Sequence, residues 1–288
     1  MVGCDAEWIR NVSGIDERRF AAEDETVAAL ATKAAQDCLA KAGMEASGVR
    51  MILVAAGSGE RRFPGPAASV AKMLGVEGVP AIDLPMASAG SLYGISLASR
   101  LAASVGNILV IGAEKMSKVI LRDPMERGVA ILFGDGAGAC LISPDSGRAE
   151  IIDSALYTDG SFSEDLKLEF GGTLEMNGRS VILQASRKIP RAISDLLEKH
   201  GRSAKDVSIF LMHQANQNLL ARIAQALGVA EEKFYSNIKQ YGNTSSASML
   251  IAAAEWVSAQ GFEPGVPVCF AAFGAGFNWG SLLAIGTE

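Results

Sequence analysis

Histidine and cysteine, the side chains that most often bind metals or carry redox chemistry, are scarce in this chain. Its 288 residues include two histidines and four cysteines. The cysteines, Cys4, Cys38, Cys140 and Cys269, lie far apart and form no CxxC pair, so the spacing predicts neither a zinc site nor a thiol–disulfide motif. We expect all four to be unpaired structural thiols in a reducing cytosol.

Long apolar runs and an excess of basic residues are also missing. No apolar stretch is long enough to span a bilayer, and the N-terminus lacks the features of a signal peptide. A net charge of -6 argues against nucleic acid or anionic membrane as a partner. The hydrophobic content of 49% allows one large domain or two fused smaller ones. The composition therefore predicts a soluble, cytoplasmic globular protein.

Short apolar runs bounded by glycine alternate with Ala- and Leu-rich amphipathic stretches, a pattern typical of buried strands connected by helices. The sequence thus predicts an α/β layered fold. The expected strands are Met51–Ala56, Val79–Leu84, Asn107–Gly112, Val129–Phe133, Gly138–Ser143, Ile151–Tyr157, Ser208–Met212, Pro267–Phe273 and Ser281–Ile285. The expected helices are Glu25–Ala42, Ala67–Leu74, Ala89–Val105, Gln184–His200, Gln214–Leu227 and Ser245–Gln260.

Two glycine-interrupted segments, Phe133–Ile142 and Phe273–Leu283, resemble each other and predict two β-hairpins. Each follows a series of expected strands and helices, so we interpret the chain as two similar halves joined near Ser143–Arg148, with an active site between them. The alternative is that Gly-rich hairpins recur by chance in α/β proteins.

Ser88 lies between an expected strand and an expected helix, among small residues that permit a sharp turn. There its hydroxyl would sit at a helix N-terminus, where the dipole and free N–H groups favour negative charge. Such a position suits a nucleophile. The competing interpretation is a helix N-cap, the commonest role of a serine before a helix.

His213 and Asn243 form the second candidate constellation. His213 follows the apolar run that ends at Met212, and Asn243 stands in a run of small residues after Gly242. A neutral imidazole and a primary amide, each at a turn after a strand, can jointly donate hydrogen bonds to an oxyanion. Taken singly, the histidine suits a structural hydrogen bond and the asparagine an ordinary turn.

Together these segments resemble the ketoacyl-ACP synthase III family of condensing enzymes. Each motif alone is weak, but the similarity runs from end to end and keeps their order. The motifs are Glu7-Trp8-Ile9, Ser13-Gly14-Ile15, Phe133-Gly134-Asp135-Gly136-Ala137-Gly138, His213-Gln214-Ala215-Asn216, Gly242-Asn243-Thr244-Ser245 and Gly276-Phe277-Asn278-Trp279-Gly280. The resemblance implies a thiolase-like duplicated fold with mixed sheets layered between helices, and it divides the chain into halves 1–147 and 148–288.

The resemblance also implies a reaction. In this family an acyl group passes from coenzyme A to a nucleophile, here residue 88, and malonyl-ACP is then decarboxylated and attacks the acyl-enzyme. His213 and Asn243 take the roles of the family's histidine and asparagine, which hold the malonyl thioester oxygen. The backbone N–H groups of Ser88 and Ala275 align with a second oxyanion hole for the acyl carbonyl.

By the same resemblance, Trp8, Arg127 and Asn216 bind coenzyme A, and Phe63 is lent to the acyl pocket of the partner in a homodimer. The implied partners are acyl-CoA and an acyl carrier protein. No cofactor is expected, because acyl-CoA is a substrate. The Gly-rich runs lie between strands with no helix N-terminus after them to bind a pyrophosphate, so no nicotinamide or flavin site is predicted, and no metal site either.

Three departures from the family pattern stand out. The family's nucleophilic cysteine falls on Ser88, whose alcohol a helix dipole cannot ionise near neutral pH, so a base is needed and His213 is the candidate. Two arginines that bind coenzyme A in the family align with Val12 and Asn218. The first half also lacks the family's opening strand. We expect that strand to be a central one, so its absence would leave unpaired backbone.

These departures keep several interpretations open. Ser88 is either a natural variant or an engineered replacement of cysteine. The leading function is a condensing acyltransferase of fatty acid or polyketide initiation. The alternatives are an ester-forming starter-unit acyltransferase and a non-catalytic, acyl-carrier-binding partner of a condensing enzyme. A thiolase or hydroxymethylglutaryl-type synthase ranks last, because the further cysteine and glutamate motifs of those relatives are missing from the sequence.

Overall fold

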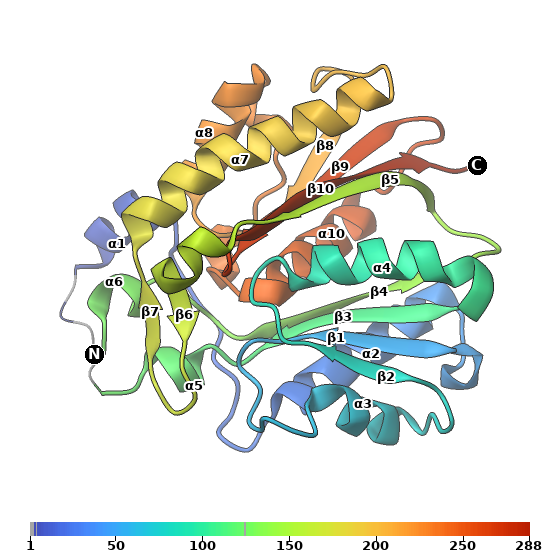
Figure 1. Cartoon of the computed structure of the whole chain (residues 1–288), viewed down its shortest axis with the longest axis horizontal. Helices are drawn as coiled ribbons and strands as arrows, with labels where there is room; N and C mark the ends of the chain where they lie inside the picture. Colours follow the sequence, from blue (N-terminus) through green and yellow to red (C-terminus); the bar gives the residue numbers. More distant parts are fainter. Residues whose placement is uncertain (1–2, 4, 124) are drawn as a thin grey trace.

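Two four-stranded β-sheets form the centre of the protein in the computed structural model, which describes residues 3, 5–123 and 125–288 (Figure 1). Cys4 lies outside the described residues. The first sheet has the order β2-β1-β3-β4, with β1 parallel to β2 and β3, and β4 antiparallel to β3. Its strands are β1 (Met51–Ala55), β2 (Ala81–Leu84), β3 (Ile108–Glu114) and β4 (Gly136–Ile142).

The second sheet has the order β5-β10-β9-β8. Its strands are β5 (Ala149–Thr158), β8 (Ile209–Met212), β9 (Pro267–Gly274) and β10 (Asn278–Gly286). Strand β8 runs parallel to β9, whereas β10 runs antiparallel to both of its neighbours. A small hairpin beside this sheet pairs β6 (Leu166–Leu168) with β7 (Leu174–Met176).

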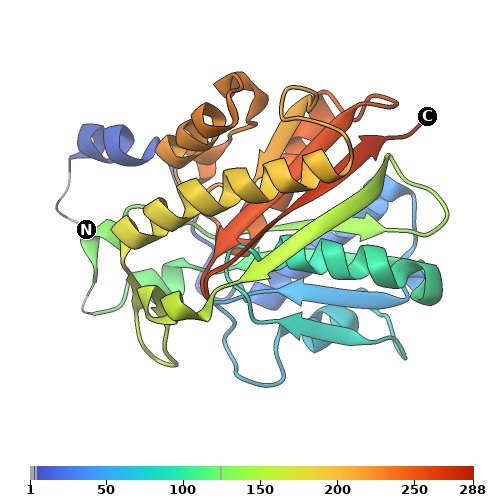
Figure 2. The ribbon, with the colours of Figure 1, turned by 45° about the horizontal axis from the view of Figure 1, so that its top comes forward.

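Helices separate and cover the sheets in five alternating layers (Figures 1 and 2). The central layer is α4 (Gly90–Val105) with α10 (Ser248–Ala259); α2 (Val27–Ala42) and α3 (Pro66–Leu74) cover the first sheet; α7 (Gly178–Lys199) and α8 (Gln217–Leu227) cover the second. One buried apolar cluster surrounds the central helices between the two sheets, and two others lie between each sheet and its outer helices. No helix of the described residues is both long and apolar enough to cross a membrane.

Short helices lie outside these layers. They are α1 (Ala6–Ser13), α5 (Ser117–Ile120), α6 (Arg127–Ala130) and α9 (Ile238–Tyr241), with 3-10 turns at Ala46–Gly48, Gly160–Asp165, Glu231–Lys233 and Ser245–Ala247. The last turn leads directly into α10 and packs on β3. A Cβ atom at Gly112 would lie 2.2 Å from the Ser246 carbonyl oxygen, so only glycine permits this close approach.

The α/β class, with mixed sheets layered between helices, and most of the expected long elements are confirmed. One expected strand is wrong: residues 129–133 enclose the end of α6 and a turn, and only Phe133 forms a bridge, to Asn243. The first expected hairpin is also wrong, because β4 pairs with β3 across a long connection rather than with the residues just before it. The second is confirmed as the β9–β10 hairpin.

The two sheets support the expected division of the chain, and we propose halves 1–147 and 148–288. Each sheet consists of strands from one half only. In the second half, β5 precedes the first long helix and pairs with the side of β10 that faces away from β9. No described strand occupies the equivalent position in the first half. The corresponding position beside β4 lies at the edge of its sheet, not at its centre as expected.

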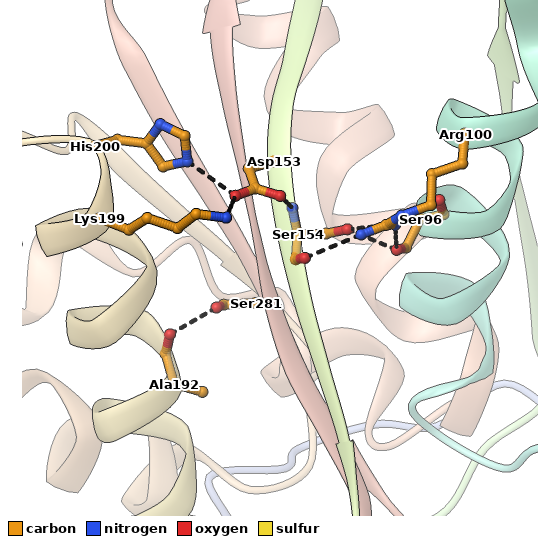
Figure 3. Close-up of polar contacts among 8 residues, drawn as sticks. All are labelled: Ser96, Arg100, Asp153, Ser154, Ala192, Lys199, His200 and Ser281. Carbon is orange, nitrogen blue, oxygen red and sulfur yellow. Dashed lines mark hydrogen bonds and ion pairs between the residues drawn. The ribbon is translucent and has the colours of Figure 1, made fainter.

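Strand β5 also connects the halves through polar contacts (Figure 3). The hydroxyl of Ser154 lies 2.6 Å from that of Ser96 on α4 and accepts a hydrogen bond from Arg100 at 2.8 Å. On the other side, Asp153 bonds Lys199 and His200 at the end of α7, at 2.7 and 2.9 Å. These contacts fix β5 between a helix of each half.

Candidate active site

Ser88 lies in a strained turn between β2 and α4. Its φ is +62°, a value that L-residues other than Asn and Asp rarely adopt, and the Ala89 N–H donates to the Ala87 carbonyl at 2.7 Å across it. Helix α4 begins at Gly90 with Ala89 as N-cap and no side-chain capping bond. The N-cap interpretation of Ser88 is therefore wrong. Its side chain is buried, with 6% exposed.

His213 follows β8 directly, and its backbone N–H donates to Ala271 on β9 at 3.0 Å. Its ring Nδ1 lies 2.6 Å from the hydroxyl of Ser248, the first residue of α10. Burial lowers the pKa of His213 to about 4, against a smaller opposing effect of the Ser245 backbone. The imidazole is therefore neutral at pH 7. Helix α8 begins at Gln217, three residues later than the sequence predicts.

Asn243 follows the short helix α9 and Gly242, and so does not follow a strand as expected. Its backbone N–H donates to Leu132 at 2.9 Å and its carbonyl accepts from Gly134 at 3.0 Å, which ties this loop to the first half of the chain. The side-chain Oδ1 accepts from the Ser245 N–H at 2.8 Å. The carboxamide therefore has its NH2 group left to donate.

Ser88, His213 and Asn243 line one cavity of about 80 Å³. The three segments come from the two halves of the chain, as the sequence predicts for a site between halves. The remaining wall is mainly apolar and comes from α7, α8 and the residues just before α8, the segment before β4, and strands β6, β7, β8 and β9. It consists of Leu132, Phe133, Leu166, Met176, Gly178, Val181, Ile182, Ile189, Met212, Ala215, Asn216, Leu219, Leu220, Ile223, Ala272 and Phe273.

The Ser88 backbone N–H, a predicted oxyanion donor, has a partner within the protein. It donates to the Ser245 hydroxyl at 3.0 Å, so an acyl oxygen would have to share it. The other predicted donor, Ala275, lies in the β9–β10 turn next to Gly274. A Cβ atom at Gly274 would lie 2.2 Å from the Ala87 carbonyl oxygen, which shows that this turn packs directly on the Ser88 turn.

Trp8 and Arg127 face each other although they are far apart in sequence. The Arg127 guanidinium carbon lies 4.8 Å from the centre of the indole, and 41% of Trp8 is exposed. The two side chains contact each other directly, so they would have to part to admit an adenine ring. Asn216 lies in the cavity wall, caps α8 and donates to the Val12 carbonyl at 3.1 Å.

The two positions that lack the family's arginines contact each other. Asn218 Nδ2 donates to the Val12 carbonyl at 3.2 Å, so α8 holds the end of α1 here. Four other arginines, Arg10, Arg18, Arg19 and Arg222, could replace the missing charges, and three of them are engaged. Arg10 pairs with Asp16, Arg18 donates to the Ile131 carbonyl, and Arg19 pairs with Glu17. The fourth, Arg222, is exposed on α8.

Phe63 does not reach the cavity of its own chain. It lies in the loop between β1 and α3, and 85% of it is exposed. This position is compatible with the predicted contact to a partner subunit. Among the described residues, no cluster of His, Cys, Asp and Glu side chains is arranged to hold a metal ion.

Three buried polar residues near the site were missed in the sequence: Glu114, Ser245 and Ser248. Glu114 accepts hydrogen bonds from Ser58 and Ser245, and Ser248 bonds His213. A signal for Glu114 existed, because it is a charged residue at the end of an otherwise apolar run. The serines gave none, since small polar residues after Asn243 also suit an ordinary turn.

Comparison with known proteins gives a consistent result. The family model for 3-oxoacyl-[acyl-carrier-protein (ACP)] synthase III matches residues 82–160, and the model for its C-terminal part matches 197–284. A beta-ketoacyl-[acyl-carrier-protein] synthase III of Oleidesulfovibrio alaskensis is 37% identical over 96% of this chain and 89% of its own. The crystal structure of the Aquifex aeolicus VF5 synthase III superposes with a TM-score of 0.93 at 34% identity, over 98% of this chain and 91% of that one. The priming β-ketosynthase of the R1128 polyketide pathway gives a TM-score of 0.90 at 28% identity, over 99% and 89%.

Proposed function

The chain belongs to the 3-oxoacyl-[acyl-carrier-protein] synthase III family, and on this premise we propose that it is a condensing acyltransferase. It moves an acyl group from acyl-CoA to residue 88 and condenses it with malonyl-ACP in fatty acid or polyketide initiation. The observation that carries this proposal is the convergence of Ser88, His213 and Asn243 on one cavity. Membership of the family supports the reaction, and the shared cavity supports these three residues as the groups that perform it.

The first step transfers the acyl group. The Ser88 oxygen attacks the thioester carbonyl, the carbon–sulfur bond breaks, and the hydroxyl proton passes through a base to the departing coenzyme A thiolate. His213 can accept that proton from its other neutral tautomer, in which Nε2 is unprotonated and the ring proton is on Nδ1. The backbone N–H of Ala275, with that of Ser88 shared from Ser245, would stabilise the oxyanion.

The second step makes the carbon–carbon bond. The malonyl carboxylate leaves as carbon dioxide, and its bonding electrons move into an enolate on the thioester oxygen. His213, in the neutral tautomer with its proton on Nε2, and the Asn243 NH2 group donate to that oxygen. The enolate carbon attacks the acyl ester, the bond to the Ser88 oxygen breaks, and the Ser88 oxygen takes up one proton from solvent. The products are carbon dioxide and a 3-oxoacyl-ACP.

We propose that Trp8, Arg127 and Asn216 bind the coenzyme A part of the donor. The Trp8–Arg127 contact at the surface and Asn216 in the cavity wall support this role, because together they extend from the exterior to Ser88. The reaction needs no cofactor of its own. No basic pair at Val12 and Asn218 is present to hold phosphates, so binding depends more on stacking than in relatives with arginines there.

The chain is proposed to act as a homodimer in which Phe63 contributes to the partner's pocket. Exposed apolar side chains support the proposal: Ile82 on the edge strand β2 is 43% exposed, and Leu97 and Leu101, one turn apart on α4, are 41% and 38% exposed. Light scattering of the purified chain tests the assembly. A monomer at micromolar concentration would contradict it.

A second function is favoured by Ser88 itself. An ester-forming starter-unit acyltransferase would acylate residue 88 but form little condensation product, and a non-catalytic carrier-binding partner would do neither. A condensing enzyme does both. The decisive assay therefore incubates the protein with short acyl-CoA and malonyl-ACP and measures 3-oxoacyl-ACP and carbon dioxide together.

We expect both products from the natural chain and a higher rate from Ser88→Cys, because a thiolate forms at a far lower pKa than an alkoxide. The double variant His213→Ala, Asn243→Ala should lose carbon dioxide release. If the natural chain and Ser88→Cys both fail to condense although the acyl-enzyme forms, the condensing function is wrong and the starter-unit function replaces it.

A further inference from the structure

Ser245 is linked to each of the three proposed functional residues through a different group, directly to Ser88 and Asn243 and through Ser248 to His213. Its hydroxyl accepts from the Ser88 backbone N–H at 3.0 Å, and its own N–H donates to Asn243 Oδ1 at 2.8 Å. Its carbonyl oxygen lies 3.0 Å from the hydroxyl of Ser248, the same hydroxyl that lies beside His213 Nδ1. Ser245 is buried and, like Ser88, has a positive φ, +50°.

Glu114 fixes the hydroxyl of Ser245 from the opposite side. The hydroxyl donates to Glu114 Oε1 at 3.0 Å, and the Glu114 side chain is fully buried at the end of β3. The same carboxyl group accepts from the backbone N–H groups of Gly57 and Ser58 at about 3 Å, and from the Ser246 hydroxyl at 2.9 Å. Its partners therefore come from the loop after β1 and from the turn before α10.

We propose that Ser245, anchored by Glu114, is a positioning residue that holds the Ser88 turn in register with Asn243 and His213; this inference rests on the proposed function. The argument is geometric. Ser88 approaches from the first half of the chain, whereas Asn243 and His213 come from the second. The Ser245 hydroxyl is a direct hydrogen-bonded link between the Ser88 backbone and the turn that orients the other two residues.

Strain makes this link necessary. A serine with φ near +60° persists only where its surroundings fix it, and the Ser88 turn has the Ser245 hydroxyl as the partner of its central N–H. Ser245 does not line the cavity, so it acts through Ser88 and does not touch substrate. Loss of the hydroxyl should change the position of the nucleophile without changing the cavity wall.

Ser246 offers a matched control. Its hydroxyl is equally buried and also bonds Glu114 Oε1, but its second contact is the Ala55 carbonyl at 2.8 Å and not Ser88. Ser245→Ala and Ser246→Ala therefore each remove one buried hydroxyl from the same carboxyl group. Only Ser245→Ala breaks the link to the Ser88 turn.

The experiment compares single-turnover acylation of residue 88 by a short acyl-CoA, and hydrogen exchange of the Ser88 amide, in the natural chain and the two variants. We expect Ser245→Ala to slow acylation roughly 10- to 100-fold, as expected for a displaced nucleophile, with the dissociation constant of acyl-CoA unchanged. The Ser88 amide should exchange faster. Ser246→Ala should change the acylation rate by less than about twofold, since it leaves this geometry intact.

Equal effects of the two substitutions on acylation and on exchange would overturn the inference, because a general loss of packing would explain both. If Ser245→Ala does not fold, Ser245→Gly replaces it, since glycine removes the hydroxyl and also tolerates a φ of +50°. An inactive natural chain would refute the proposed function. In that case the exchange comparison still decides the inference, because it needs no turnover.

Discussion

The Nδ1 atom of His213 and the hydroxyl oxygen of Ser248 lie 2.6 Å apart, and the single proton of that hydroxyl decides what His213 can do. The Gln214 N–H already donates to the same oxygen at 3.0 Å, and the Ser245 carbonyl lies 3.0 Å away as a second acceptor. If the hydroxyl donates to Nδ1, the ring presents Nε2–H, a donor. If it donates to Ser245, the ring presents a bare Nε2, a base.

We expect the resting protein to hold His213 with its proton on Nε2, as the proposed enolate contact needs. Nitrogen-15 NMR of a histidine-labelled sample tests this tautomer, and the chain simplifies the assignment because it has only one other histidine, His200. Ser248→Ala should shift the tautomer, slow malonyl decarboxylation, and destabilise the fold by about 1–3 kcal/mol through lost buried hydrogen bonds. A proton on Nδ1 in the natural chain would show that His213 is set as a base instead.

The low pKa of His213 gives a pH dependence whose direction is fixed. Because burial lowers this pKa to about 4, the ring stays neutral from pH 8 down to about pH 5, and decarboxylation of malonyl-ACP should not fall near pH 6.5 on account of this group. The unfolded chain binds the proton between pH 6.5 and 4 and the folded chain does not. His213 therefore lowers the free energy of unfolding as the pH falls through that range. An NMR midpoint for His213 near 6.5 would contradict the expectation.

Trp8→Ala tests the surface end of the proposed coenzyme A site. Loss of the indole removes its stacking with Arg127 and with an adenine, so we expect KM for acyl-CoA to rise roughly fivefold, equivalent to about 1 kcal/mol. An acyl-pantetheine thioester lacks the adenine, so its KM should be the same for both proteins. A similar increase with both donors would mean that Trp8 supports the cavity rather than binding the nucleotide.

Asp153 should stabilise the fold above acidic pH. Hydrogen bonds from Lys199 first, and also from His200 and the Ser154 N–H, hold the pKa of this carboxyl at about 2 (Figure 3). A lowered pKa adds stability that is complete above the unfolded value of 3.8 and is lost as the pH falls towards 2. Asp153→Asn should therefore lower Tm at pH 7 and lose this difference near pH 2.

Asp195→Asn is the control for that substitution. Asp195 pairs with Arg191 at 3.5 Å, and both side chains are largely exposed, so its loss should change stability little. Tm measured by circular dichroism across the pH range compares the two. A deficit of Asp153→Asn that stays constant down to pH 2 would mean that packing, not charge, is responsible.

The long elements were predictable because their apolar patterns are strong. In the sequence, strand β3 appears as an uninterrupted apolar run and helix α2 as a periodic one. The structure places both close to their expected bounds. Residues 129–133 are also apolar, but five such residues fit a strand or a buried helical turn equally well. The contact that decides between these two structures is the bridge from Phe133 to Asn243, and it joins residues more than a hundred positions apart.

The site shows the same limit. Ser88, His213 and Asn243 could be selected from the sequence because each stands at a turn among small residues and carries a group suited to catalysis. The link between them could not. Glu114 and Ser245 meet only because β3 and the turn before α10 pack together, and no local pattern encodes that contact. The hydrogen bond from the Ser88 N–H to Ser245 could not be predicted either, because the sequence suggested this N–H only as an oxyanion donor.

The most direct test of the account is the mass of the intact chain after incubation with a short acyl-CoA, followed by peptide mapping. We expect one acyl group per chain, on Ser88, resistant to neutral hydroxylamine as an oxygen ester is, and none on Ser88→Ala. No adduct after hours of incubation, or an adduct that persists on Ser88→Ala, would contradict the assignment of residue 88 as the acyl carrier.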